Sequence, residues 1–241
     1  MLCIKKFFTY VIYFIRSCLF NLVFFPYVAS IAIVYKFVSP NKYQNLIRAY
    51  SRVFHLIVKY LAGIDYKLFN TENKKPYPVI YALKHESAWE TMALIHVFSP
   101  CVFVLKEELT KIPVFGKFLT DVGMIAIDRT SAIQSVRQIV KETKAAVQKG
   151  NSIVIFPEGT RAKPGVLNTL QSGIYAPYSI NKLPVVPVFL DSGKFWPRKS
   201  FLKKSGTVTV DFLEEIKPGL DKDEFMTKLT SAFQNRMNGE K

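Results

Sequence analysis

The chain has 241 residues, enough for one domain with an appended segment. It carries 33 Lys and Arg against 18 Asp and Glu, a formal net charge of +15, and 49% of its residues are hydrophobic. This hydrophobic content excludes a disordered chain, and a protein that is both basic and apolar suits an anionic membrane better than nucleic acid.

The first quarter of the chain is predicted to attach the protein to a membrane. Residues 1–64 contain eight Lys or Arg and no acidic residue, and residues 17–35 are apolar, rich in aromatic side chains and free of charge. Such a stretch in a helix is about long enough to cross the hydrocarbon core, although Pro26 is expected to break or kink it. A spanning helix, a re-entrant hairpin, helices lying in the interface and a cleaved signal peptide remain as alternatives. We assign residues 1–63 to this membrane-attachment segment.

A second helix is predicted in the same segment, at residues 41–62. Its apolar side chains recur at steps of three and four residues, and Gly63 follows as a stop signal. The opposite face carries Lys42, Arg48, Arg52 and Lys59. We expect the apolar face to pack on the domain and the basic face to turn toward lipid headgroups.

From residue 64 onward the sequence alternates between predicted strands and helices. Apolar, β-branched runs mark strands at 64–69, 78–83, 101–105, 123–127, 152–156, 185–190 and 207–213. Helix-like segments lie at 87–98, 131–149, 168–180 and 221–238. This order predicts an α/β domain over 64–241, with a single mixed, largely parallel sheet flanked by helices.

The first polar cluster follows the predicted strand at 78–83. His85 comes directly after that strand, and Glu90 lies five residues further on. An imidazole can take a proton from a hydroxyl near neutral pH, and a carboxylate on its other nitrogen fixes the tautomer. The two side chains can meet only if His85 lies in the turn and Glu90 in the first turns of the helix. The HExxH zinc motif is excluded because Trp89 stands where its second histidine would be, so no metal is expected.

The second polar cluster follows the predicted strand at 152–156. Gly159 lets backbone come close to a ligand, Arg161 offers a planar fork for a phosphate, and Thr160 can donate a further hydrogen bond. Glu158 could orient Arg161 or bind an acceptor hydroxyl. We therefore predict an anion site and assign Glu158, Gly159, Thr160 and Arg161 to substrate binding. It is not a Walker loop, because the Gly-Lys-Ser/Thr ending is missing.

Together, the two clusters and two further blocks resemble the phospholipid/glycerol acyltransferase family. KHESAWE at 84–90 is similar to the family's H-x4-D motif, with Glu in place of Asp, and FPEGTR at 156–161 is a very close match. Residues 105–129 and the proline-containing run at 183–188 resemble two further family blocks. The resemblance covers roughly residues 60–215.

The resemblance implies transfer of a fatty acyl group from a thioester to the sn-2 hydroxyl of 1-acyl-glycerol-3-phosphate. His85 would be the general base and Glu90 would hold it, while backbone amides near this cluster could stabilise the oxyanion. Arg161 would bind the acceptor phosphate, with Lys106 and Arg129 as further phosphate ligands. No cofactor is implied besides acyl-CoA or acyl-carrier protein as co-substrate.

The expected partners are an anionic phospholipid membrane, lysophosphatidic acid, and acyl-CoA or acyl-carrier protein, with no nucleic acid. The expected location is the bacterial inner membrane, with the catalytic domain on the cytoplasmic side. A basic stretch at 192–204 with interleaved aromatic residues could meet lipid headgroups, the phosphates of CoA or an acidic carrier protein. An acyltransferase for another lysophospholipid or lyso-aminolipid is one alternative, and a non-enzymatic membrane or nucleic-acid-binding protein is another.

Overall fold

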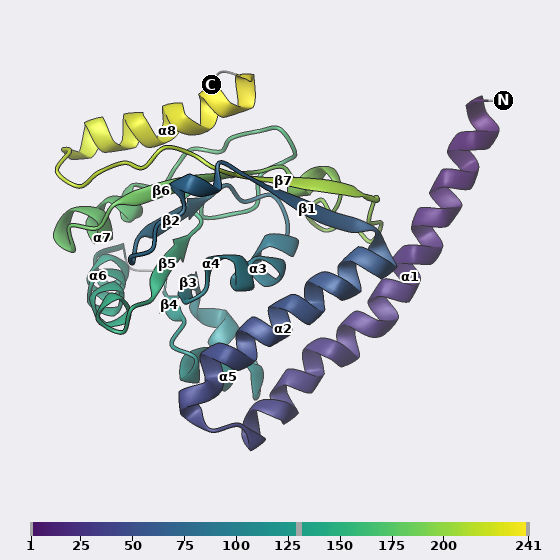
Figure 1. Ribbon diagram of the computed structural model, residues 1–241, viewed down its shortest axis with the longest axis horizontal. Helices are drawn as coiled ribbons and strands as arrows, with labels where there is room; N and C mark the ends of the chain where they lie inside the picture. Colours follow the sequence, from purple (N-terminus) through teal and green to yellow (C-terminus); the bar gives the residue numbers. More distant parts are fainter. Residues whose placement is uncertain (1, 129–131, 240–241) are drawn as a thin grey trace.

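One mixed β-sheet organises the molecule. The computed structural model describes residues 2–128 and 132–239, and within these ranges seven strands form a single sheet in the order β1-β7-β6-β2-β5-β3-β4 (Figure 1). All neighbouring strands are parallel except β6 and β7. The strands are β1 Ile64–Phe69, β2 Ile80–Leu83, β3 Cys101–Lys106, β4 Ile125–Ile127, β5 Ser152–Ile155, β6 Val185–Leu190 and β7 Gly206–Phe212. The predicted fold class is confirmed.

The central strands explain why the sequence predicted this sheet. Every residue of β2 and of β5 is buried. Strands of a parallel sheet with both faces covered carry continuous apolar runs, and both strands have them. In Figure 1, α8 lies above the sheet, and α2, α3 and α4 lie below it.

The helices agree with the predictions in part. They are α1 Leu2–Val34, α2 Tyr43–Ile57, α3 Trp89–Ala93, α4 Ile95–Phe98, α5 Phe115–Asp121, α6 Ala132–Gln148, α7 Tyr175–Ile180 and α8 Lys222–Asn238. The helix predicted at 87–98 is interrupted at Leu94, and α5 was not predicted.

The helix predicted at 168–180 is wrong over its first residues. The backbone amide of Asn168 donates to the Glu158 carboxylate (2.8 Å), and that of Gln171 donates to the Pro157 carbonyl (2.8 Å). These amides are thus bonded to the loop after β5, and a helix begins only at Tyr175.

The first helix continues through Pro26. The break predicted at this residue is therefore wrong, and the structure places no turn within residues 17–35. Immediately after the proline, Tyr27 donates from its hydroxyl to the Tyr50 carbonyl of α2, and the two rings stack with centroids 5.1 Å apart. This contact with α2 supports the helix where the proline removes an internal hydrogen bond.

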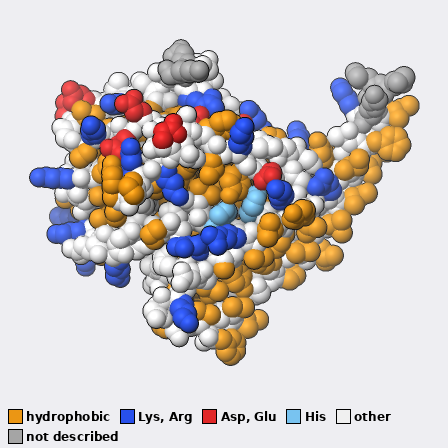
Figure 2. Space-filling model, in the orientation of Figure 1, with side chains coloured by type: hydrophobic (Ala, Val, Ile, Leu, Met, Phe, Trp, Pro, Cys, Tyr) orange, Lys and Arg blue, Asp and Glu red, His pale blue; other side chains and the backbone are white. Residues whose placement is uncertain are grey.

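Most of the apolar surface of α1 is not covered by the rest of the chain. At 1.5 Å per residue this helix is about 50 Å long, and it is long and apolar enough to cross a membrane. Figure 2 shows hydrophobic side chains along the outer side of the segment that Figure 1 labels α1. The exposed large side chains there include Ile4, Phe7, Phe8, Ile12, Phe14, Ile15, Leu19, Leu22, Phe25 and Ile33.

Candidate active site

The functional residues gather at one edge of the sheet. Strands β6, β2, β5, β3 and β4 all run in the same direction, so their carboxyl ends meet there. His85 follows β2, Glu158 to Arg161 follow β5, and Lys106 ends β3. The predicted ligand Arg129 lies outside the described residues.

His85 and Glu90 are in direct contact. The Nδ1 atom of His85 lies 2.9 Å from Oε1 of Glu90, and the imidazole stacks on the ring of Phe156 with centroids 4.1 Å apart. The carboxylate can only accept, so Nδ1 carries the proton and Nε2 keeps its lone pair. The His85 side chain is 15% exposed, and no other described residue bonds to Nε2. Nε2 is thus the ring nitrogen that is left to accept a proton.

Glu90 is held by four donors. Its Oε1 accepts from His85 Nδ1 and from the backbone amides of Glu86 (2.8 Å) and Ser87 (2.7 Å). Its Oε2 accepts from the hydroxyl of Ser192 (2.7 Å), which is buried. Because Glu90 lies in the first turn of α3, its side chain, which is one methylene longer than that of Asp, reaches back to all these groups. Ser192 was missed by the sequence analysis, and no local motif marks it.

Three backbone amides next to the imidazole are not free to serve as oxyanion donors. The amides of Glu86 and Ser87 serve Glu90, and the amide of His85 donates to Oε1 of Glu158 (2.8 Å). All three amides of this turn therefore hold carboxylates. Their role is to fix the loop that carries the imidazole.

Glu158 connects the two clusters through the backbone. Its Oε1 accepts from the His85 amide and its Oε2 from the Asn168 amide, both at 2.8 Å. Burial raises the pKa of the Glu158 carboxyl, while these two hydrogen bonds act in the opposite direction. With both oxygens engaged, Glu158 orients the loop, whereas the sequence assigned it to the substrate. The Ala162 amide completes the junction by donating to the His85 carbonyl (2.7 Å).

A buried ion pair flanks His85 on both sides in the sequence. The Nζ of Lys84 donates to Oε1 of Glu86 (2.6 Å) and to the carbonyl of Val166 (2.8 Å), and both charged side chains are fully buried. Glu86 also accepts from the amides of Gly165 (3.2 Å) and Gly193 (3.1 Å). The pair therefore ties together three loops that follow β2, β5 and β6. No motif in the sequence predicted this pair.

The cationic side chains at this edge are open to solvent. Arg161 is half-buried, and its guanidinium has no hydrogen-bond or ion-pair partner among the described residues. Lys106 is exposed and likewise unpaired within residues 2–128 and 132–239. Gly159 adopts a φ of 68°, which favours glycine and forms the turn between Glu158 and Thr160. The loop after β5 thus carries an unneutralised Arg161 beside the loop that carries His85, as an anion site requires.

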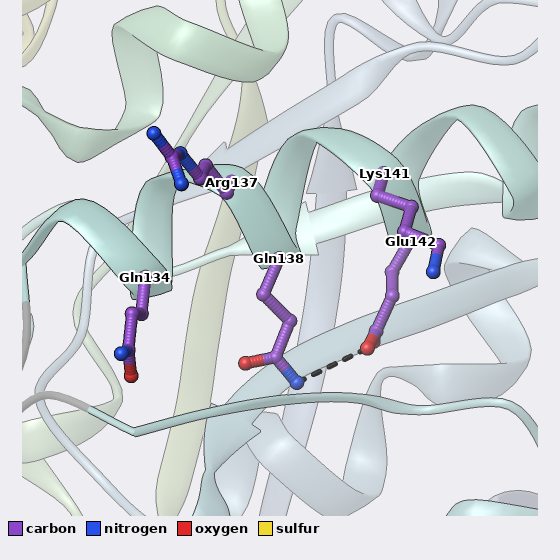
Figure 3. Close-up of a pocket in the computed structure, with 5 residues that line it drawn as sticks. All are labelled: Gln134, Arg137, Gln138, Lys141 and Glu142. Carbon is purple, nitrogen blue, oxygen red and sulfur yellow. Dashed lines mark hydrogen bonds between the residues drawn. The ribbon is translucent and has the colours of Figure 1, made fainter.

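A surface pocket lies elsewhere and carries no comparable chemistry. Its lining comes entirely from α6, and Gln138 donates to Glu142 across it (3.1 Å) (Figure 3). Because the pocket is a groove between side chains of one helix, we assign it no role in the active site. Its lining residues are Gln134, Arg137, Gln138, Lys141 and Glu142.

Comparisons with known proteins show the family of the chain. The model of a family described as acyltransferase matches residues 66–191. A 1-acyl-sn-glycerol-3-phosphate acyltransferase of Pseudomonas aeruginosa is 34% identical over 169 residues, covering 70% of this chain and 66% of that protein. The protein of the same name from Saccharomyces cerevisiae is 27% identical over 145 residues, covering 59% and 48%. The chain thus spans between about half and two thirds of the length of these relatives.

A solved structure has the same fold. The crystal structure of the 1-acyl-sn-glycerophosphate acyltransferase of Thermotoga maritima superposes with a TM-score of 0.76, covering 93% of this chain and 94% of that one. The two sequences are 17% identical, so this likeness concerns the fold.

Proposed function

The chain belongs to the acyltransferase family, and on this premise we propose that it acylates the sn-2 hydroxyl of 1-acyl-glycerol-3-phosphate. The product is phosphatidic acid, and the donor is a fatty acyl thioester of CoA or of acyl-carrier protein. The names of the relatives from Pseudomonas aeruginosa and Saccharomyces cerevisiae support this acceptor. The observation that carries the proposal is the His85–Glu90 contact, which leaves Nε2 open beside the loop of Arg161.

The proposed chemistry needs one base and no enzyme nucleophile. Nε2 of His85 removes the proton of the acceptor hydroxyl, and the oxygen attacks the thioester carbonyl carbon. Glu90 stabilises the imidazolium that forms. When the tetrahedral intermediate collapses, the C–S bond breaks and the thiolate leaves with the proton from His85. This sequence requires no metal or cofactor besides the acyl thioester.

Cationic groups at the same edge of the sheet are the proposed ligands of the acceptor phosphate. Arg161 is the first candidate, because its planar fork can bind two phosphate oxygens and no carboxylate of the described residues neutralises it. Lys106 is a second candidate, since it ends β3, next to β5 in the sheet. Arg129 stays a prediction from the sequence.

The exposed helix α1 supports attachment to a membrane. Its uncovered apolar side chains would lie in lipid, and the basic residues flanking them suit an anionic surface. We propose the bacterial inner membrane as the location, with the α/β domain on the cytoplasmic side. Protease treatment of sealed inverted and right-side-out vesicles tests this orientation, and cleavage of the domain from the periplasmic side would contradict it.

The central experiment is acyl transfer with a panel of lysolipids. Purified protein in vesicles is given labelled acyl-CoA or acyl-carrier protein together with lysophosphatidate, another lysophospholipid or a lyso-aminolipid. We expect the highest kcat/KM with lysophosphatidate. A higher value with another acceptor would replace the proposed substrate by that alternative, and no transfer to any of them would overturn the enzymatic assignment.

Arg161→Ala tests the phosphate site. We expect the KM for lysophosphatidate to rise about 10- to 100-fold with little change in kcat, because a charge-assisted hydrogen bond to the phosphate is lost. The KM for an acceptor without phosphate, such as monoacylglycerol, should not change. Arg137→Ala on the outer face of α6 removes the same charge and serves as the matched control. An unchanged KM for lysophosphatidate in Arg161→Ala would remove this residue from the site.

A further inference from the structure

The connection between β6 and β7, residues 191–205, joins the active-site edge to helix α1. We call it the β6–β7 segment. It includes Ser192, whose hydroxyl holds Glu90, and it contains the basic and aromatic stretch noted in the sequence. Its basic residues are Lys194, Arg198, Lys199, Lys203 and Lys204.

One side of the segment is packed firmly on α1. Trp196 contacts Phe20 edge to face with centroids 5.1 Å apart, and the Lys203 amide donates to the hydroxyl of Ser17 (2.9 Å). The ammonium of Lys203 lies over the rings of Trp196 (4.8 Å) and Phe20 (5.2 Å). The exposed apolar helix therefore holds this segment in place beside the site.

The other side of the segment reaches the anion loop. Nη1 of Arg198 donates to the hydroxyl of Thr160 at 3.4 Å, which places its guanidinium next to the residue that precedes Arg161. Lys194 is neutralised by Asp191 (3.0 Å), but no carboxylate faces Arg198 or Arg161 among the described residues. Most of the five N–H donors of Arg198 remain available for a ligand.

We propose that Arg198 is a specificity-determining residue that binds the acceptor phosphate together with Arg161. The contact of Arg198 with Thr160 brings it to the loop that carries Arg161, and an anion bound by both guanidinium groups would offset the repulsion between their charges. A phosphate monoester carries a charge of about −1.5 to −2 at pH 7, whereas a phosphodiester headgroup carries about −1 at its phosphate. The pair therefore favours lysophosphatidate over lysolipids whose phosphate is esterified twice. This inference rests on the proposed function and names the feature that selects its acceptor.

The neighbouring residue supplies a matched control. Lys199 is exposed like Arg198, and no hydrogen bond or ion pair of its side chain occurs within the described residues. Arg198→Gln and Lys199→Gln each remove one positive charge from the same segment, but only the first removes the guanidinium beside Thr160. Arg198→Lys keeps the charge and removes the planar fork. Both positions are at the surface, so the three variants should fold.

The experiment measures KM values for lysophosphatidate, for lysophosphatidylglycerol and for acyl-CoA with the full chain in vesicles. For Arg198→Gln we expect the KM for lysophosphatidate to rise about 10- to 100-fold at unchanged kcat. The preference for lysophosphatidate over lysophosphatidylglycerol should fall by a similar factor. Arg198→Lys should restore only part of this preference, and Lys199→Gln should have the same KM values as the wild type. An equal rise in KM for Lys199→Gln would mean that the effect comes from the total charge of the segment and not from the Arg198 guanidinium. A rise in the KM for acyl-CoA alone would mean that Arg198 binds the acyl donor. Either result, or no change, overturns the proposal.

Direct binding separates this inference from the proposed function. Lysophosphatidate dispersed below its aggregation concentration is titrated calorimetrically into the wild type and the three variants. Binding that is weaker in Arg198→Gln, partly restored in Arg198→Lys and unchanged in Lys199→Gln supports the phosphate site even if the wild type transfers no acyl group, which would contradict only the proposed reaction. Equal binding in all four proteins overturns the role of Arg198 even if transfer is observed.

Discussion

Replacing His85 by alanine is expected to reduce acyl transfer by about a hundredfold to ten-thousandfold. Nε2 of His85 is the proposed proton acceptor, and general bases contribute rate factors of this size. The loss should appear in kcat, because the imidazole acts on the hydroxyl in the transition state and contributes little to binding. Single-turnover transfer from labelled acyl-CoA to lysophosphatidate measures it.

Two controls make this result interpretable. His55→Gln changes a histidine on α2 whose Nε2 lies 3.4 Å from Asp65, away from the proposed site, and its activity should stay near that of the wild type. Binding of His85→Ala to anionic vesicles should also be unchanged, since α1 is untouched. Wild-type turnover by a folded His85→Ala protein would eliminate the mechanism proposed above.

Replacing Lys84 by methionine is expected to lower the free energy of unfolding by about 3–5 kcal/mol. The substitution leaves the carboxylate of Glu86 in a buried site without its cation, and it removes the hydrogen bond to the Val166 carbonyl. This loss is a large part of the stability of an ordinary domain. Urea unfolding in detergent measures it, with the fluorescence of the buried Trp89 as the signal.

The double variant decides the prediction if the single variant does not fold. Lys84→Met combined with Glu86→Gln removes both charges, so much of the stability should return. Lys117→Met is the exposed counterpart, because Lys117 pairs with Asp121 at 2.9 Å while its side chain is 70% exposed. Its cost should be much smaller than that of Lys84→Met, because solvent screens the exposed pair. An equal loss of unfolding free energy in Lys84→Met and Lys117→Met would mean that the buried pair contributes no more to stability than the exposed pair.

Local sequence predicted most of the secondary structure. Each of the seven predicted strands overlaps an observed one. The strands that are buried on both faces, such as β2 and β5, need apolar runs that are visible in the sequence. The prediction at 168–180 failed over its first residues, where the amides of Asn168 and Gln171 are bonded to the Glu158 carboxylate and the Pro157 carbonyl in the loop after β5. At Pro26 a break was predicted and a continuous helix was found, since contacts with α2 support the helix around this residue.

The sequence by itself determined the fold class and the pairing of His85 with Glu90. Both depend on neighbours in the chain: a buried strand, a turn and the first residues of a helix. Only the tertiary structure decided how this pair is supported. Ser192 lies 102 residues from Glu90, and Gly193 lies 107 residues from Glu86. A serine or a glycine has no distinguishing pattern of its own, so its role depends on which strands end side by side. The sheet order places β6 next to β2, and that adjacency turns separate loops into one site.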